Sequence, residues 1–99
     1  MNTEATIAKQ AIQDKLESQI ELAEAKLHTL KAQAENAKAN AEIEAIAGLL
    51  PKKQSIQRKL QDLKKSSGEA WERAKADLEA LIADLQKSVK RIESKAKAH

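Results

Sequence analysis

The chain has 99 residues, of which 41% are hydrophobic and 33% charged, with a formal net charge of +3. It contains no cysteine, phenylalanine or tyrosine, which excludes disulfides and thiolate metal ligands and leaves few large side chains for a deep globular core. This composition favours long helices or a coiled coil in one small domain, residues 1–99.

The N-terminus does not have the pattern of a signal peptide. Met1 to Glu4 contain no basic region followed by an apolar run. No apolar stretch approaches the roughly 20 residues that a membrane span needs. We therefore expect a cytoplasmic protein.

The first predicted helix covers about residues 3–47. From Leu16 its apolar residues are spaced alternately four and three apart, which is the heptad pattern of a coiled coil. The members of this seam are Leu16, Ile20, Ala23, Leu27, Leu30, Ala34, Ala37 and Ala41.

The helical pattern is interrupted at residues 48–51, at the midpoint of the chain. Gly48 can end a helix in the left-handed conformation, and Pro51 suits the first turn of the next helix. This order predicts a turn. A continuous helix kinked at Pro51 is the alternative, because the apolar phase roughly survives across the site.

The second predicted helix covers about residues 52–97. Its seam consists of Ile56, Leu60, Leu63, Ser67, Ala70, Ala74, Leu78, Leu81, Leu85, Val89, Ile92 and Ala96. Residues 66–68 are a possible bend or restart, since Ser66 and Glu69 have the spacing of a capping box. A helix running to about residue 65, with a short helix returning from 69, is the alternative fold.

The two seams predict an all-α fold, an antiparallel two-helix hairpin with its turn near 48–51. In such a hairpin residue i lies roughly opposite residue 99 − i, so that Ala34 and Ala37 meet the region of Leu60 and Leu63. Residues 1–47 carry a charge of 5 − 8 = −3 and residues 48–99 carry 13 − 7 = +6, which favours this pairing modestly.

Several apolar residues lie off the seams, and a lone hairpin would leave them in water. They are Ile7, Leu22, Ile43, Ile46, Leu50 and Ile82. Pairing of hairpins into a helical bundle would cover them. The sequence thus predicts a structural or protein-interaction protein that associates with itself or docks on a larger assembly.

Five residues are candidates for contact with a partner. Leu49 and Leu50 would protrude at the tip of the hairpin, and Ile43 and Ile46 lie just before it. Trp71 either fills space against Leu27 and Leu30 or serves as an interface hot spot, where tryptophan is enriched.

No motif in the chain indicates catalysis, a cofactor or a metal. There is no Gly-x-Ser-x-Gly elbow and no phosphate loop. His28 and Glu24 are four residues apart, whereas di-iron bundles use Glu-x-x-His. We expect no enzyme activity and no small-molecule substrate.

Two alternative functions rest on the basic second half. A membrane-surface or lipid-binding protein is suggested by the amphipathic, lysine-rich stretch 78–92 together with Leu49 and Leu50. Non-specific nucleic-acid binding is suggested by runs such as Lys52 and Lys53, and by Lys87 to Lys97. The second alternative is weaker, because aromatic stacking platforms are missing.

Residues 59–71 read KLQDLKKSSGEAW, which resembles the KLxxLKxxSGEAW signature of a family of small bacterial coiled-coil proteins associated with stress responses. An earlier stretch beginning at Leu27 includes LKAQAENAKANAEIE, which is similar to that family's LKAKAEKAKADAKIE run. The resemblance covers roughly residues 12–92. It implies a non-enzymatic helical protein and supplies no catalytic residues.

Overall fold

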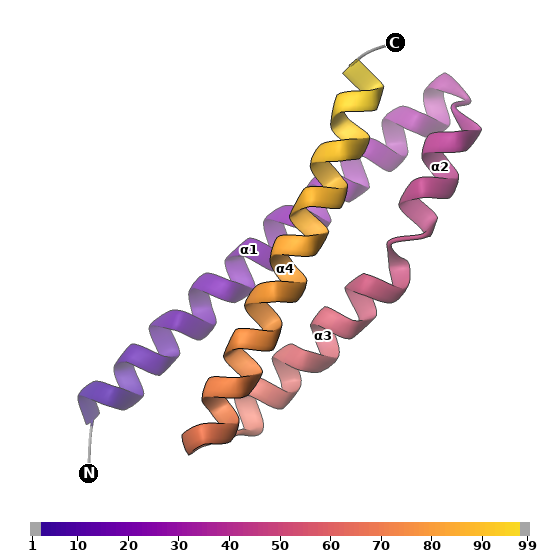
Figure 1. The fold of residues 1–99 in the computed structure, drawn as a ribbon. Coiled ribbons are helices and arrows are strands. Elements are labelled where there is room, and N and C mark those ends of the chain that lie inside the picture. The colour runs from indigo at the N-terminus through magenta and orange to yellow at the C-terminus, as the bar shows by residue number, and fades with distance from the viewer. Residues whose placement is uncertain (1–2, 98–99) are drawn as a thin grey trace.

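A computed structural model describes residues 3–97, and within that range the chain forms four helices and no strand. The helices are α1 (Thr3–Ala37), α2 (Asn40–Ala47), α3 (Leu50–Lys65) and α4 (Gly68–Lys97) (Figure 1). The all-α prediction is confirmed.

The helices form a compact three-helix arrangement, and the predicted two-helix hairpin is wrong. The chain ascends through α1, returns through α2 and α3 as one bent arm, and ascends again through α4 (Figure 1). The rod measures 56 × 19 × 16 Å. Its length matches α1, whose 35 residues span about 52 Å at 1.5 Å per residue.

Polar contacts between neighbouring helices define the register. Glu24 accepts a hydrogen bond from Gln57, and Glu17 pairs with Lys64, so α1 and α3 meet where residue numbers sum to 81. Lys52 pairs with Asp84 and Lys59 with Asp77, so α3 and α4 meet at a sum of 136. Two antiparallel helices are joined by a turn near the residue whose number is half of this sum. The two sums therefore place the reversals near residues 40 and 68. The register of 99 − i is therefore wrong.

The first reversal falls at residues 38–39, inside the first predicted helix. Lys38 takes the left-handed conformation with φ of 56°. Its N–H donates to the Glu35 carbonyl, and the N–H of Ala39 donates to the Ala34 carbonyl at 2.9 Å. This is the Schellman pattern that closes a helix, with lysine where glycine is usual.

Residues 48–51 bend the middle arm without reversing it. Gly48 has φ of −65° and Leu49 has φ of −87°, so both stay near helical geometry. The Gly48 N–H still donates to the Glu44 carbonyl at 2.9 Å. The predicted turn is wrong here, because Pro51 removes one donor and displaces the helix axis while the chain keeps its direction.

The second reversal falls at residues 66–68, where the sequence predicted a possible bend or restart and, in the alternative fold, a short helix returning from residue 69. Gly68 is left-handed with φ of 58°. The Ser66 hydroxyl donates to the Asp62 carbonyl at 2.6 Å, so this side chain closes α3 and does not cap α4. Three consecutive small residues permit the tight passage into α4.

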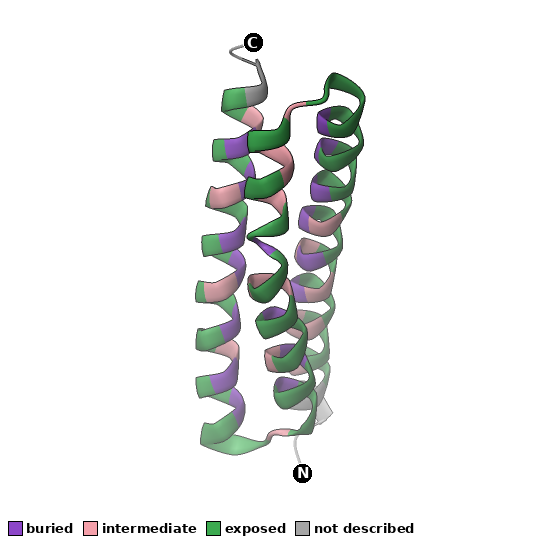
Figure 2. Cartoon of the chain, turned by 90° about the vertical axis from the view of Figure 1, so that its right-hand side faces the viewer, coloured by how far each residue is buried: buried purple, intermediate pink, exposed green. Residues whose placement is uncertain are grey.

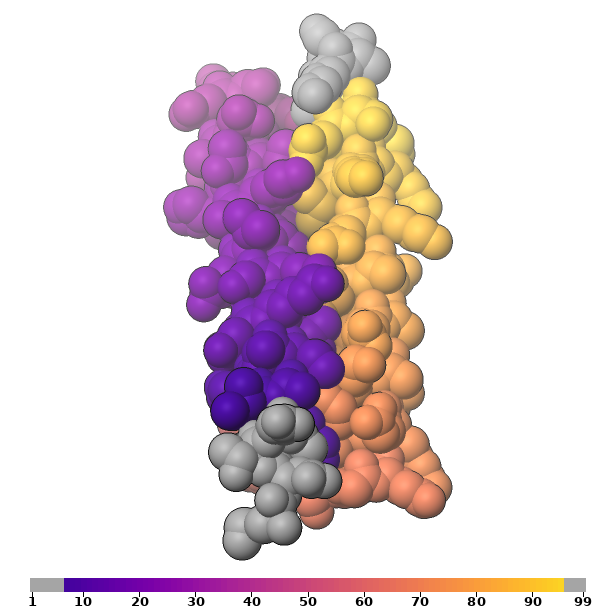
Figure 3. All heavy atoms as spheres, turned by 90° about the vertical axis from the view of Figure 1, so that its left-hand side faces the viewer, coloured from indigo at the N-terminus to yellow at the C-terminus, as the bar shows by residue number. Residues whose placement is uncertain are grey.

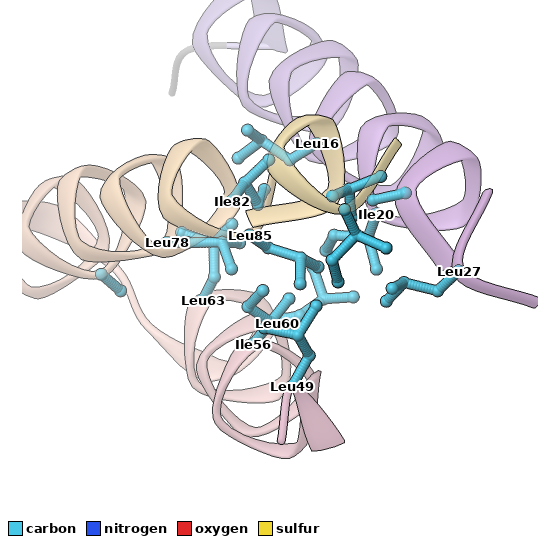
Figure 4. Close-up of a cluster of buried hydrophobic side chains, with 14 of the residues drawn as sticks. Leu16, Ile20, Leu27, Leu49, Ile56, Leu60, Leu63, Leu78, Ile82 and Leu85 are labelled. Atoms are coloured by element: carbon cyan, nitrogen blue, oxygen red, sulfur yellow. The ribbon is translucent and has the colours of Figure 1, made fainter. Parts of the chain in front are cut away.

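One apolar core runs between the three arms, and the buried positions of α1, α3 and α4 face inward (Figure 2). Leucine and isoleucine side chains from α1, α3 and α4 converge on its middle, as Figure 4 shows. The most completely buried large side chains are Ile56, Leu63, Leu78, Ile82 and Leu85.

The heptad seams locate much of this core. The α1 seam is buried from Leu16 to Ala34, but Ala37 and Ala41 are exposed because the helix ends between them. In the second half Ser67 and Ala70 are exposed and Trp71 is buried. Leu81 is half-buried while Ile82 is buried. The Ala96 side chain lies outside the described residues.

Substitutions at the left-handed residues of the two reversals should change stability in opposite directions. Lys38→Gly is expected to stabilise the fold and Gly68→Ala to destabilise it, each by about 1 kcal/mol, because left-handed backbone is strained for residues with a Cβ atom. Urea denaturation monitored by circular dichroism measures both changes.

Gly48→Ala is the matched control. Its added Cβ would make ordinary contacts, 3.4 Å from the Ala45 carbonyl oxygen, and its backbone is helical. This variant should be neutral or slightly stabilising. A loss as large as that of Gly68→Ala would mean that residues 48–51, and not 66–68, hold the reversal.

Whether Ile82 or its neighbour Leu81 faces the core is also testable. Ile82→Ala should cost about 2–5 kcal/mol of unfolding free energy, because it opens a cavity in the core. Leu81→Ala should cost clearly less, because that side chain is half-buried. Chemical denaturation of the two variants measures both losses of unfolding free energy. A larger loss for Leu81→Ala would contradict the observed orientation of α4.

Candidate functional site

α2 is the helix whose apolar residues are least covered. Five of its eight residues are alanine or isoleucine, yet none is buried. In Figure 2 its ribbon carries exposed and intermediate colours alone, whereas α1 and α4 show buried positions along their length. Ile43 and Ile46 are partly buried, and Ile46 still packs against the edge of the core. Partly covered apolar side chains on a short helix are typical of a contact surface.

A groove of about 290 Å³ lies on one flank of α2, between α1 and the middle arm. We call it the α1–α2 groove. Its lining residues are Glu24, Leu27, His28, Lys31, Ile43, Ile46, Ala47, Leu50 and Lys53. Three of the five predicted partner residues meet here, namely Ile43, Ile46 and Leu50, and Leu50 is 52% exposed.

A larger groove of about 540 Å³ lies on the other flank, between the middle arm and α4. We call it the α2–α4 groove. Its lining residues are Ala41, Glu42, Ala45, Gly48, Leu49, Lys52, Ser88, Arg91, Ile92 and Lys95. An apolar floor is therefore bordered by three cations and, among the described lining residues, one acid.

Lys52 is held in place at the border of this groove. Its ammonium lies 2.8 Å from the Asp84 carboxylate and donates to the Ser88 hydroxyl at 3.3 Å. The hydrogen bond from Lys52 lowers the pKa of Asp84, with further lowering by the charges of Lys52, Lys87 and Arg91. Asp84 is therefore a stable anion at neutral pH and not a proton donor.

The other two predicted partner residues lie elsewhere. Leu49 is 7% exposed and packs with Ile56 and Leu60 in the core, with its edge on the α2–α4 groove (Figure 4). Trp71 is 2% exposed and lies near the start of α1, where the Lys9 ammonium sits 5.1 Å from the ring centroid. Neither presents a protruding side chain to a partner.

A third groove runs between α1 and α4, on the face shown in Figure 3. It is lined by Gln19, Leu22, Ala23, Lys26, Ala83, Gln86, Lys87, Val89 and Lys90. Leu22 is 66% exposed here. Four cations of α4 thus divide between two grooves, with Lys87 and Lys90 on this side and Arg91 and Lys95 on the other.

The sequence did not predict that Lys52, Arg91 and Lys95 line one groove. Both basic runs are visible in it, but their placement at the same groove depends on the register of the middle arm with α4. His28 is exposed at the α1–α2 groove, and His99 lies outside the described residues. Within residues 3–97 no three histidine or carboxylate side chains converge as metal ligands.

Among the helices of the described range, none has the length and apolar content that a membrane span requires.

Comparisons with protein-family models, with curated proteins and with solved structures found no match to this chain. The resemblance to the stress-associated coiled-coil family therefore stays a prediction from residues 59–71 and the stretch beginning at Leu27.

The Lys52–Asp84 pair predicts a small pH dependence of stability. Because the folded pKa of Asp84 is lowered, its contribution is fully present above the unfolded value, about 3.9, and is lost as pH falls through the folded value. Asp84→Asn should flatten the fall of the unfolding temperature below about pH 4. Thermal melts across acid pH measure this.

Lys52→Met should flatten the same profile, because it removes the partner that lowers the pKa of Asp84. If Asp84→Asn follows the wild-type profile throughout, the ion pair makes no contribution to stability in solution.

Proposed function

We propose that this chain is a non-enzymatic helical protein that acts through protein–protein contact, and that the α1–α2 groove joins two copies of it. The observation that carries the proposal is α2, whose isoleucines Ile43 and Ile46 are only partly buried by its own bundle, next to the exposed Leu50.

The charges around this groove suit a second copy. Glu24 lies on the same rim as Lys31 and Lys53, so both signs are present. An interface between two identical surfaces must be self-complementary, which a rim of one sign is not. The apolar centre formed by Ile43, Ile46 and Leu50 would be covered by its own equivalent.

A membrane-surface function has less support than it had from sequence. That alternative relied on an apolar face of residues 78–92, and Leu78, Ile82, Leu85 and Val89 are all buried in the core. Leu49 is buried as well, which leaves Leu50 as the exposed member of the pair. An interfacial helix needs its apolar face available to lipid.

Nucleic-acid binding also has little support. The last turns of α4 display Lys87, Lys90, Arg91 and Lys95, which suit phosphate contacts. The single aromatic residue, Trp71, is buried, so no ring is available for bases to stack on.

Analytical ultracentrifugation tests the proposal. The wild-type chain should form a dimer whose population rises with concentration, and Leu50→Glu should weaken dimerisation at least about tenfold by placing a charge in the apolar centre. Ile43→Glu should act in the same direction. Circular dichroism shows whether each variant keeps its helices.

Leu22→Glu is the matched control. Leu22 is 66% exposed, compared with 52% for Leu50, but it lies in the groove between α1 and α4. Its substitution should leave the dimer unchanged. A wild-type chain that stays monomeric at every concentration, or equal weakening by both leucine variants, would reject this interface.

A further inference from the structure

We propose that the α2–α4 groove binds a free single-chain amphiphile with an anionic head, such as the carboxylate of a fatty acid. The inference is independent of dimerisation, because the α1–α2 groove lies on the other flank of α2.

The hollow above the apolar floor is left by small residues of the middle arm. Extending the sum of 136 from α3 to α2 puts Ala41 opposite Lys95, Ala45 opposite Arg91 and Gly48 opposite Ser88, and all six residues line the groove. Side chains as short as alanine and glycine do not reach across to α4. The edges of Leu49 and Ile92 are therefore left at the bottom of a hollow.

The border of the groove selects the charge of the ligand head. Lys52, Arg91 and Lys95 contribute three positive charges, against the carboxylates of Glu42 in the lining and of Asp84 beside Lys52, which leaves 3 − 2 = +1. Because Lys52 is paired with Asp84 and held by Ser88, Arg91 and Lys95 are the main candidates to bind an anionic head. A second copy of the same groove is not favoured, because both would carry a net positive charge.

The size of the groove favours a small molecule. Its volume of about 540 Å³ lies within the range of about 300–1,000 Å³ usual for ligand pockets, which are mostly apolar with a few polar groups that orient the ligand. An alkyl chain would lie along Ala41, Ala45 and Leu49. Its head would meet the guanidinium of Arg91 or the ammonium groups of Lys52 and Lys95.

The test is a titration of the ¹⁵N-labelled full chain with dodecanoate below its micelle concentration, followed by amide chemical shifts. Saturable changes are expected in residues 41–52 and 88–95, with none at Trp71, which lies near the other end of the bundle. Dodecyltrimethylammonium, with the same chain and a cationic head, should bind at least about tenfold more weakly, and dodecanol should also bind more weakly.

Two charge-reversed variants separate this groove from general attraction to a basic helix. Arg91→Glu with Lys95→Glu should weaken dodecanoate binding at least about tenfold. Lys87→Glu with Lys90→Glu makes the same change of charge on the same helix but lines the α1–α4 groove, and it should have little effect. Circular dichroism and urea midpoints confirm that both variants fold.

Any of four results would overturn the proposal. These are the absence of saturable shifts, equal binding of the cationic analogue, equal losses in the two charge-reversed variants, and flotation with anionic vesicles without binding of free dodecanoate. An acidic helix as the natural occupant would reach beyond the groove, and sensitivity to Lys87→Glu with Lys90→Glu would reveal it.

Discussion

The bundle depends on covering the apolar stripe of α4. This helix contacts each of the other three, and it supplies seven of the seventeen buried apolar residues found among the described positions. Its buried positions recur at steps of three and four from Trp71 to Ile92, with Leu81 half-buried beside them. One helix alongside would leave part of this stripe in water, whereas α1 and the middle arm together enclose it.

That requirement explains why the chain reverses twice. Three rods of similar length need reversals near one third and two thirds of the sequence, and they fall at residues 38–39 and 66–68. The second has local support from Ser66, Ser67 and Gly68. The first has none from glycine or proline, so the burial of α1 against its neighbours outweighs the strain of a left-handed Lys38.

The sequence predicted the helices and much of the core, because heptad spacing follows directly from burial of one helix face. It did not predict the topology, because the strongest local signals, Gly48 and Pro51, mark a bend. The apolar spacing shows why: Ile46, Leu49, Ile56, Leu60 and Leu63 keep one heptad phase across the bend, with Lys53 at the intervening position. The unbroken heptad spacing across residues 48–51 indicated a kinked helix, which is correct. Gly48 and Pro51 indicated a turn, which is wrong.

The candidate sites follow from the same topology. Ile43, Ile46 and Leu50 were selected as surplus apolar residues. Leu50 is exposed and the two isoleucines are partly buried, with Ile46 against the core, because α2 is only eight residues long between a reversal and a kink. So short a helix covers little of its neighbours, and its alanines leave space on both flanks. Trp71, by contrast, was selected for its residue type alone. The predicted seam placed the preceding residue, Ala70, in the core, but in the structure Trp71 is buried and Ala70 is exposed. The grooves beside α2 thus arise where the bundle is packed with its smallest side chains, and Arg91 and Lys95 of α4 line one of these grooves and not the other.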